Sequence, residues 1–175
     1  METKSKVIQE LKEWTKAFVI VGTFAYILFS VIIINASVPS ASMYPTIATD
    51  DRIIASRLAF LFNQPERFDI VIFENPTNHQ GEYFIKRVIG LPGDLVEIRS
   101  GVVYIDGVPL EGDADFIKEP FWGNWGPQVV EPDTLFVLGD HRNNSLDSRS
   151  FGFIDQDTLV GRGVFKYFRN LQILR

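Results

Sequence analysis

The sequence predicts a mainly β protein, with a single N-terminal transmembrane helix followed by an all-β domain. Two observations favour this fold class. An uncharged apolar stretch lies near the N-terminus, and the chain after it consists of short apolar runs separated by Gly, Pro, Asn and Asp, without an amphipathic helical pattern. The chain has 175 residues, of which 46% are hydrophobic, so it can bury a core of ordinary size.

Residues 17–34 form the apolar stretch, and as a helix they would span about 27 Å, close to the hydrocarbon thickness of a bilayer. A soluble core helix would be polar on one face, and the apolar core of a cleaved signal peptide is usually shorter, about 7–15 residues. The next basic residue is Arg52, whereas four precede the stretch: Lys4, Lys6, Lys12 and Lys16. The positive-inside rule therefore predicts a cytoplasmic segment 1–16, a retained anchor 17–34 and an extracytoplasmic domain 35–175.

After the anchor, residues 35–49 are uncharged and Pro45 excludes a helix there. Short apolar or β-branched runs predict strands at 52–56, 68–73, 85–89, 95–98, 102–105, 134–138 and 159–168. Ser100-Gly101 predicts a hairpin and Asp106-Gly107 a second tight turn. Gly161 and Gly163 indicate bulges in the last strand. Residues 111–132, rich in Gly, Pro, Trp and acidic side chains, are expected to form an irregular surface loop.

Composition excludes several classes of function. The chain carries 17 basic and 22 acidic side chains, a net charge of −5, which argues against a nucleic-acid partner. It has no cysteine, so disulfides, thiolate nucleophiles and thiolate metal sites are ruled out. No cluster of metal ligands has a recognisable spacing, and we expect neither a metal nor a cofactor.

Lys86 lies in an apolar strand, where it shares a face with Phe84 and Val88, while Arg87 shares the other face with Ile85 and Ile89. Such a lysine either extends to water or is a buried amine with a lowered pKa. A neutral amine can take the proton of a serine hydroxyl, provided that its pKa falls from about 10.4 towards 7–8. The serine-rich segment 40–46 offers such a hydroxyl, although a plain linker is the favoured interpretation of that segment taken by itself.

Residues 139–152 are densely polar and contain two acid–x–Arg pairs, Asp140/Arg142 and Asp147/Arg149. A solvated loop is one interpretation, and a loop fixed by internal ion pairs is the other. A Ser-His-Asp triad is disfavoured, because the two histidines, His79 and His141, lie in polar loops and adjacent Asp140 is poorly placed to orient His141. No pair of acids has a spacing that indicates glycoside hydrolysis.

These motifs together resemble the type I signal peptidases, membrane-anchored serine proteases that remove signal peptides from exported proteins. The resemblance covers most of the chain and depends on motifs in the family's order, after the anchor: VPSASMYPT (38–46), DRII (51–54), DIVIF (69–73), IKRVIGLPGD (85–94), GDHRNNSLDSRSFG (139–152) and VGRGVFKYF (160–168). His141 stands where the family often has asparagine, and Phe68 where glycine is common.

The resemblance implies an antiparallel, barrel-like β-sheet catalytic domain on the outer side of the cytoplasmic membrane. It also implies a Ser/Lys dyad peptidase that cuts after small-x-small motifs, with exported precursors and the lipid bilayer as partners. Its site would consist of the nucleophile Ser42 and the general base Lys86, an oxyanion hole from Ser40 and the Ser42 N–H, Ser145 orienting the Lys86 amine, the supporting pairs Asp147–Arg149 and Asp140–Arg142, and a pocket lined by Val38, Met43, Ile47 and Ile85. A membrane-tethered binding domain without chemistry, or a protease that cuts itself or one partner, is the alternative.

Overall fold

The computed structural model describes residues 2–78, 81–167 and 171–174, and the chain divides into two compact units, Met1–Ile33 and Ile34–Arg175. The first unit is the helix α1 (Glu2–Ile32). Its segment Lys6–Ile32 contains an 18-residue window with a mean hydropathy of 1.9 and is long and apolar enough to cross a membrane. The helix begins well before residue 17, because the polar residues ahead of the apolar stretch are good helix formers. It ends before residue 34, where β-branched residues enter a strand.

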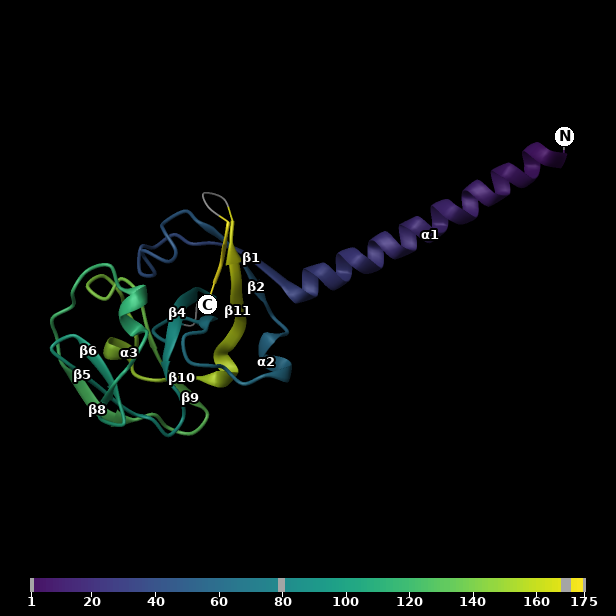
Figure 1. The fold of residues 1–175 in the computed structure, drawn as a ribbon. Helices are drawn as coiled ribbons and strands as arrows, with labels where there is room; N and C mark the ends of the chain where they lie inside the picture. The colour runs from purple at the N-terminus through teal and green to yellow at the C-terminus, as the bar shows by residue number, and fades with distance from the viewer. Residues whose placement is uncertain (1, 79–80, 168–170, 175) are drawn as a thin grey trace. The chain divides into compact units, whose positions relative to one another are not determined.

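The second unit is mainly β, as predicted, and is organised around two antiparallel sheets (Figure 1). Within the described residues, the large sheet is a half-barrel with the strand order β1-β2-β11-β3-β4-β9-β10, and β12 pairs with β11. Its strands are β1 (Ile33–Ser37), β2 (Arg52–Ser56), β3 (Ile70–Glu74), β4 (Tyr83–Gly90), β9 (Thr134–Leu138), β10 (Ile154–Asp155), β11 (Leu159–Lys166) and β12 (Gln172–Ile173).

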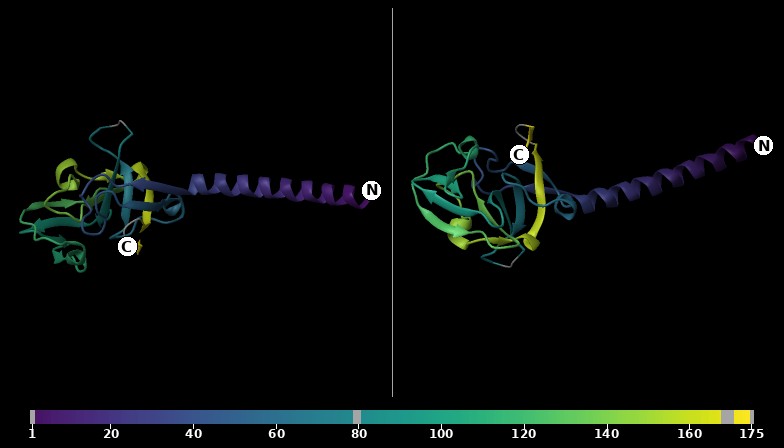
Figure 2. Two further views of the ribbon diagram at one scale, coloured as in Figure 1. Left: turned by 90° about the horizontal axis from the view of Figure 1, so that it is seen from above. Right: turned by 60° about the horizontal axis from the view of Figure 1, so that its bottom comes forward.

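The small sheet has the order β7-β6-β5-β8, formed by β5 (Leu95–Arg99), β6 (Val102–Ile105), β7 (Val108–Pro109) and β8 (Trp125–Val129). In the views of Figures 1 and 2 it lies at the opposite end of this unit from β2 and β11. The two predicted tight turns are confirmed: Ser100 and Gly101 have φ of 48° and 83°, and Asp106 and Gly107 have 54° and 80°. Positive φ at both central residues matches the right-handed twist of the flanking strands.

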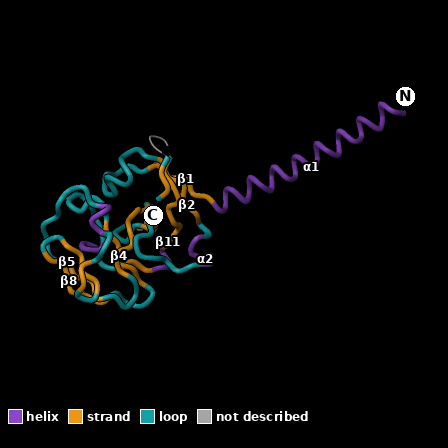
Figure 3. The backbone as a smooth tube through the Cα atoms, viewed as in Figure 1, coloured by secondary structure: helices purple, strands orange, loops and turns teal. Residues whose placement is uncertain are grey.

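The helices of the second unit are single turns, so strands and loops dominate it (Figure 3). They are α2 (Ala59–Phe62), α3 (Ser148–Phe151) and the 3-10 turns η1 (Asp113–Phe116) and η2 (Gln156–Thr158). The predicted strands 52–56, 102–105 and 134–138 are confirmed at both ends. The register of β11 shifts next to Gly161 and Gly163, as the glycines indicated, and Phe168 lies outside the described residues.

The prediction for residues 111–132 was wrong in part. The segment contains η1 and β8, and β8 completes the small sheet by pairing with β5. Its glycines and Pro127 concealed the strand, because both residue types normally mark turns. The apolar side chains of β5, β6, β4 and β9 meet in one buried cluster, which includes Ile89, Val96, Val103, Phe136 and Leu138 and joins the two sheets.

Candidate active site

Lys86 lies on β4 at a point where the strand has a neighbour on one side only. β3 pairs with β4 from Tyr83 to Arg87, whereas β9 pairs with β4 only from Arg87 onward. Within the described residues, no strand covers the other edge of 83–86. Unpaired backbone groups at a sheet edge can accept an added strand, so this edge is able to bind an extended peptide.

The Lys86 amine is held in an apolar environment against a serine. Nζ donates a hydrogen bond to Ser42 Oγ at 2.8 Å and another to the Ile85 carbonyl oxygen at 3.0 Å. The Phe84 ring lies 5.2 Å from Nζ, and the cross-strand neighbour on the same face is Val71. Burial lowers the pKa of Lys86 from 10.5 to about 8, while the carboxylates of Asp147 and Asp140 act in the opposite direction. Of the two interpretations that the sequence left open for Lys86, the structure therefore favours the buried amine over a side chain extended to water.

Ser42 is presented by a folded loop between β1 and β2 rather than by a flexible linker. Val38 N–H donates to the Asp51 carbonyl and Asp50 N–H to the Val38 carbonyl, which closes the base of the loop. The loop is anchored by Met43 and Ile47, which are fully buried in the core. Ser40 lies beside Ser42, with its Oγ 3.2 Å from Ser42 Oγ.

The loop after β9 is tied to the Ser42 loop by His141. Its backbone N–H donates to the Ser42 carbonyl at 3.0 Å, and its ring Nδ1 lies 3.2 Å from the Ala41 carbonyl oxygen. Because a carbonyl only accepts hydrogen bonds, this contact requires a proton on Nδ1. His141 therefore links two loops, and the other histidine of the sequence, His79, lies outside the described residues.

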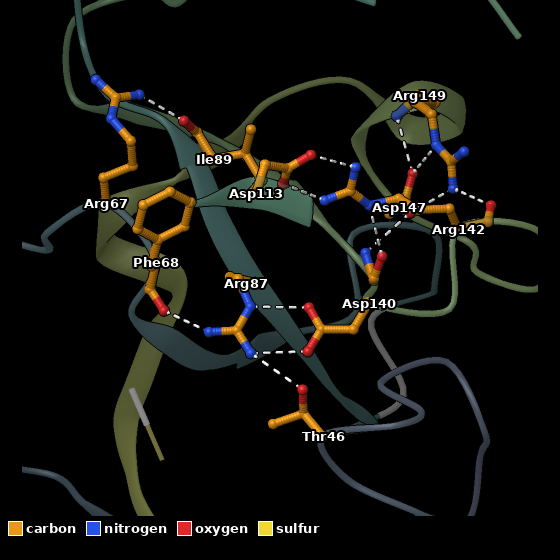
Figure 4. A network of polar contacts seen from close by, with 11 residues as sticks. Thr46, Arg67, Phe68, Arg87, Ile89, Asp113, Asp140, Arg142, Asp147 and Arg149 are labelled. Atoms are coloured by element: carbon orange, nitrogen blue, oxygen red, sulfur yellow. Dashed lines mark hydrogen bonds and ion pairs between the residues drawn. The ribbon is translucent and has the colours of Figure 1, made fainter. Parts of the chain in front are cut away.

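The acid–arginine pairs of this loop differ from the local pairing that the sequence indicated (Figure 4). Asp147 and Arg149 pair as predicted, with Arg149 Nε 2.8 Å from Asp147 Oδ1. The predicted pair Asp140–Arg142 was wrong. Asp140 pairs instead with Arg87, and Arg142 with Asp113 from the segment 111–132. Two residues apart in a tight loop, the side chains of Asp140 and Arg142 diverge to partners from distant parts of the chain.

Sequence reasoning missed Arg87 and Asp113 as the ion-pair partners of Asp140 and Arg142. Arg87 is fully buried, and its Nε and Nη2 bond both carboxylate oxygens of Asp140 at 2.8 and 2.7 Å. The Phe116 ring lies 3.6 Å from its guanidinium carbon. The sequence held one indication of the first. Arg87 lies in an apolar strand, on the face opposite Lys86, and a buried arginine requires an acidic partner.

Ser145 does not make the hydrogen bond expected of it. Its Oγ is buried, and it has no hydrogen-bond partner among the described residues. It packs against the backbone of Gly139, where an added Cβ would lie 2.2 Å from Ser145 Oγ and 2.5 Å from the Ser42 carbonyl oxygen. Ser145 therefore lies close to the Ser42 backbone, and only glycine fits at position 139.

A cavity of about 650 Å³ opens beside Ser42 and Lys86. Val38 and Ile85 line it as predicted, but Met43 and Ile47 do not, because both side chains point into the core behind it. Sequence reasoning missed most of its apolar wall, which comes from separate strands and from the loop after β9: Ile34, Ala36, Ile72, Phe84, Leu146 and Val160. Across residues 2–78, 81–167 and 171–174, no group of three His, Asp or Glu side chains is arranged to hold a metal ion.

Comparison with known proteins adds independent information. The family described as signal peptidase, peptidase S26, matches residues 11–168. A signal peptidase I of Leptolyngbya laminosa is 42% identical over 139 residues, covering 75% of this chain and 66% of that protein. Thylakoidal processing peptidase 1 of Arabidopsis thaliana chloroplasts is 35% identical over 173 residues, covering 94% and 50%. A signal peptidase I of Bacillus caldolyticus is 32% identical over 170 residues, covering 89% and 88%. The chain thus spans about two thirds of the first relative and half of the second.

Proposed function

This chain belongs to the signal peptidase family, peptidase S26, and we propose that it is a membrane-anchored serine endopeptidase that removes signal peptides from exported precursors. The observation that carries the proposal is the contact of 2.8 Å between Lys86 Nζ and Ser42 Oγ, made by an amine whose pKa is lowered to about 8. A hydroxyl is a weak nucleophile until a base takes its proton, and this amine is a base of suitable strength. At pH 7 about one molecule in ten holds Lys86 neutral and reactive.

In the proposed reaction, neutral Lys86 accepts the proton of Ser42 Oγ as this oxygen bonds to the scissile carbonyl carbon. The π electrons of the scissile carbonyl move onto its own oxygen, and this oxyanion accepts hydrogen bonds from the Ser42 N–H and the Ser40 hydroxyl. The Lys86 ammonium then protonates the leaving amine as the C–N bond breaks. Water, deprotonated by Lys86, attacks the acyl-enzyme, and the returning proton restores the Ser42 hydroxyl.

The substrate would bind as an added strand along the open edge of residues 83–86, with its side chains entering the cavity beside Ser42. The wall of aliphatic and aromatic side chains favours apolar residues before the cut, and we propose that these are the small residues of a small-x-small motif. Ser145 is proposed to engage the Lys86 amine once substrate is bound, since catalytic hydrogen bonds often tighten only in the complex.

We also propose the membrane topology that the sequence predicts. Residues 1–16 would be cytoplasmic, 17–34 the anchor, and 35–175 the catalytic domain on the outer side of the cytoplasmic membrane. The length and hydropathy of α1 support an anchor.

The test is cleavage of a precursor with an intact signal peptide, in detergent, by the wild type, Ser42→Ala and Lys86→Ala. We expect the wild type to cut after a small-x-small motif and both folded variants to be inactive. A Lys86→Ala variant with near-normal activity would place the base elsewhere. A wild type that cuts neither this precursor nor itself would favour a tethered binding domain.

A further inference from the structure

The segment Asp113–Phe121, which lies outside the family motifs, packs along the residues that support the active site. Five of its contacts reach residues close to the site: Asp113 with Arg142, Phe116 with Arg87 (3.6 Å), Lys118 with the Tyr44 hydroxyl (2.7 Å), the Pro120 carbonyl with Asn143 Nδ2 (3.0 Å) and Phe121 with Arg149 (4.7 Å). Four of the five are made with an arginine or asparagine of β4, of the loop after β9 or of α3. The segment therefore contacts the charged and polar residues around the candidate active site, although it belongs to none of the motifs that carry the resemblance.

The contact of Asp113 is a buried, two-pronged ion pair (Figure 4). Asp113 and Arg142 are 5% and 3% exposed, and Arg142 Nη1 donates to Asp113 Oδ2 at 2.9 Å while Nη2 donates to Oδ1. The remaining nitrogen, Nε, donates to the Gly139 carbonyl oxygen at 3.1 Å. Because a guanidinium is planar and rigid, fixing its two outer nitrogens fixes where Nε can bind.

Gly139 is the point at which this support reaches the reacting groups. Its N–H donates to Asp147 Oδ2 at 3.0 Å, so both of its backbone groups are held by charged side chains. Its Cα packs against Ser145 Oγ and the Ser42 carbonyl oxygen so closely that no Cβ fits. A shift of Gly139 in this direction would therefore push against the backbone that carries Ser42.

We propose that Asp113 is a positioning residue for the peptidase reaction, acting through Arg142 and Gly139 to hold Ser42 in place against Lys86. This inference rests on the proposed function. The charge of Asp113 is the active property, because a neutral side chain of the same shape leaves Arg142 buried without a counter-charge and free to turn towards other acids.

The experiment compares Asp113→Asn, which keeps the shape, with Asp113→Glu, which keeps the charge, in the full chain in detergent. We expect kcat of Asp113→Asn to fall by about tenfold or more while KM changes less than about threefold, because the cavity wall from β3, β4 and β11 is untouched. Asp113→Glu should retain more activity than Asp113→Asn. A purely packing role predicts the reverse order and overturns the proposal, as does a kcat of Asp113→Asn within twofold of wild type.

The matched control is Asp115→Asn, in the same 3-10 turn but exposed, and its kcat should stay within about twofold of wild type. An equal loss in this control overturns the proposal. If Asp113→Asn fails to fold, the double variant Asp113→Asn/Arg142→Gln removes the unpaired charge. It should fold and remain slow, and wild-type kcat in it counts against the proposal.

Hydrogen exchange of the Gly139 and His141 amides separates this inference from the proposed function. The Gly139 N–H donates to Asp147 Oδ2, and the His141 N–H donates to the Ser42 carbonyl oxygen. Asp113→Asn should accelerate the exchange of both amides at least about fivefold, whether or not the chain cleaves precursors. Absence of wild-type cleavage with accelerated exchange would refute the peptidase and keep the link from Asp113 to Gly139. Unchanged exchange would refute the link.

Discussion

Replacing Lys86 by methionine should abolish activity and make the folded protein more stable. Methionine fills a similar volume without a charge, whereas the ammonium of Lys86 is held in a buried, apolar place beside Phe84 and Val71. Burial lowers the pKa of this lysine from 10.5 to about 8, which corresponds to about 3 kcal/mol against the charged form, at about 1.36 kcal/mol for each pH unit. The folded wild type is destabilised by this amount at neutral pH, and the folded variant is not.

The sign of the pH dependence follows from the two protonation states. Below pH 8 Lys86 is charged in both the folded and the unfolded chain, and the full destabilisation is present. Between pH 8 and 10.5 the folded chain has lost the proton and the unfolded chain still binds it, so the destabilisation shrinks. The advantage of Lys86→Met should therefore be about 3 kcal/mol at pH 7, about 2 at pH 9 and less than about 0.5 at pH 10.5.

The assay is guanidinium unfolding of the full chain in detergent at these three pH values, followed by the fluorescence of Trp122 and Trp125. Lys118→Met is the control, since the hydrogen bond to Tyr44 raises the pKa of this exposed lysine and its loss should be slightly destabilising. A Lys86→Met variant that is less stable than wild type, or whose advantage does not change with pH, would refute the argument that Lys86 is a desolvated base.

Three further predictions concern the same site. The pH profile of kcat/KM should fall about tenfold per unit below pH 8, because only neutral Lys86 acts as a base, and a limb near pH 6.5 would indicate a histidine instead. Asp140→Asn should lower the free energy of unfolding by about 3–5 kcal/mol, because it leaves Arg87 buried without its acid; a loss under about 1 kcal/mol in guanidinium unfolding would contradict this. Gly139→Ala should reduce kcat at least about tenfold by pushing Ser145 and the Ser42 carbonyl aside, whereas Gly22→Ala in α1, with open space around it, should cleave precursors at the normal rate.

The sequence predicted the sheets and the position of Lys86 well, because both depend on local patterns. Alternation along β4 puts Lys86 and Arg87 on opposite faces, and short apolar runs between turn residues mark the strands. The partners of the charged residues could not be predicted in the same way. Arg142 pairs with Asp113, 29 positions away, and Arg87 with Asp140, 53 positions away, and a local motif suggests only the nearest acid.

The cavity was predicted only in part for a similar reason. Val38 and Ile85 belong to recognisable motifs, whereas Ile72 and Val160 reach the cavity because β3, β4 and β11 lie side by side in the half-barrel. Met43 lies next to Ser42 in the sequence, but adjacent side chains diverge, and its side chain enters the core. The resemblance therefore gave two of the pocket residues, Val38 and Ile85, and misplaced two others, Met43 and Ile47.

The adjacency of Lys86 and Arg87 on β4 has a consequence for how this protein can vary. Deleting a single residue between Tyr83 and Ile85 would shift the strand by one position and exchange the two faces. A guanidinium, which cannot give up its proton in a protein, would then meet Ser42. Val88 would take the place of Arg87, and Asp140 would stay buried without its arginine. Catalysis and folding would fail together, so we expect natural length variation in this protein to be confined to its loops and absent from β4.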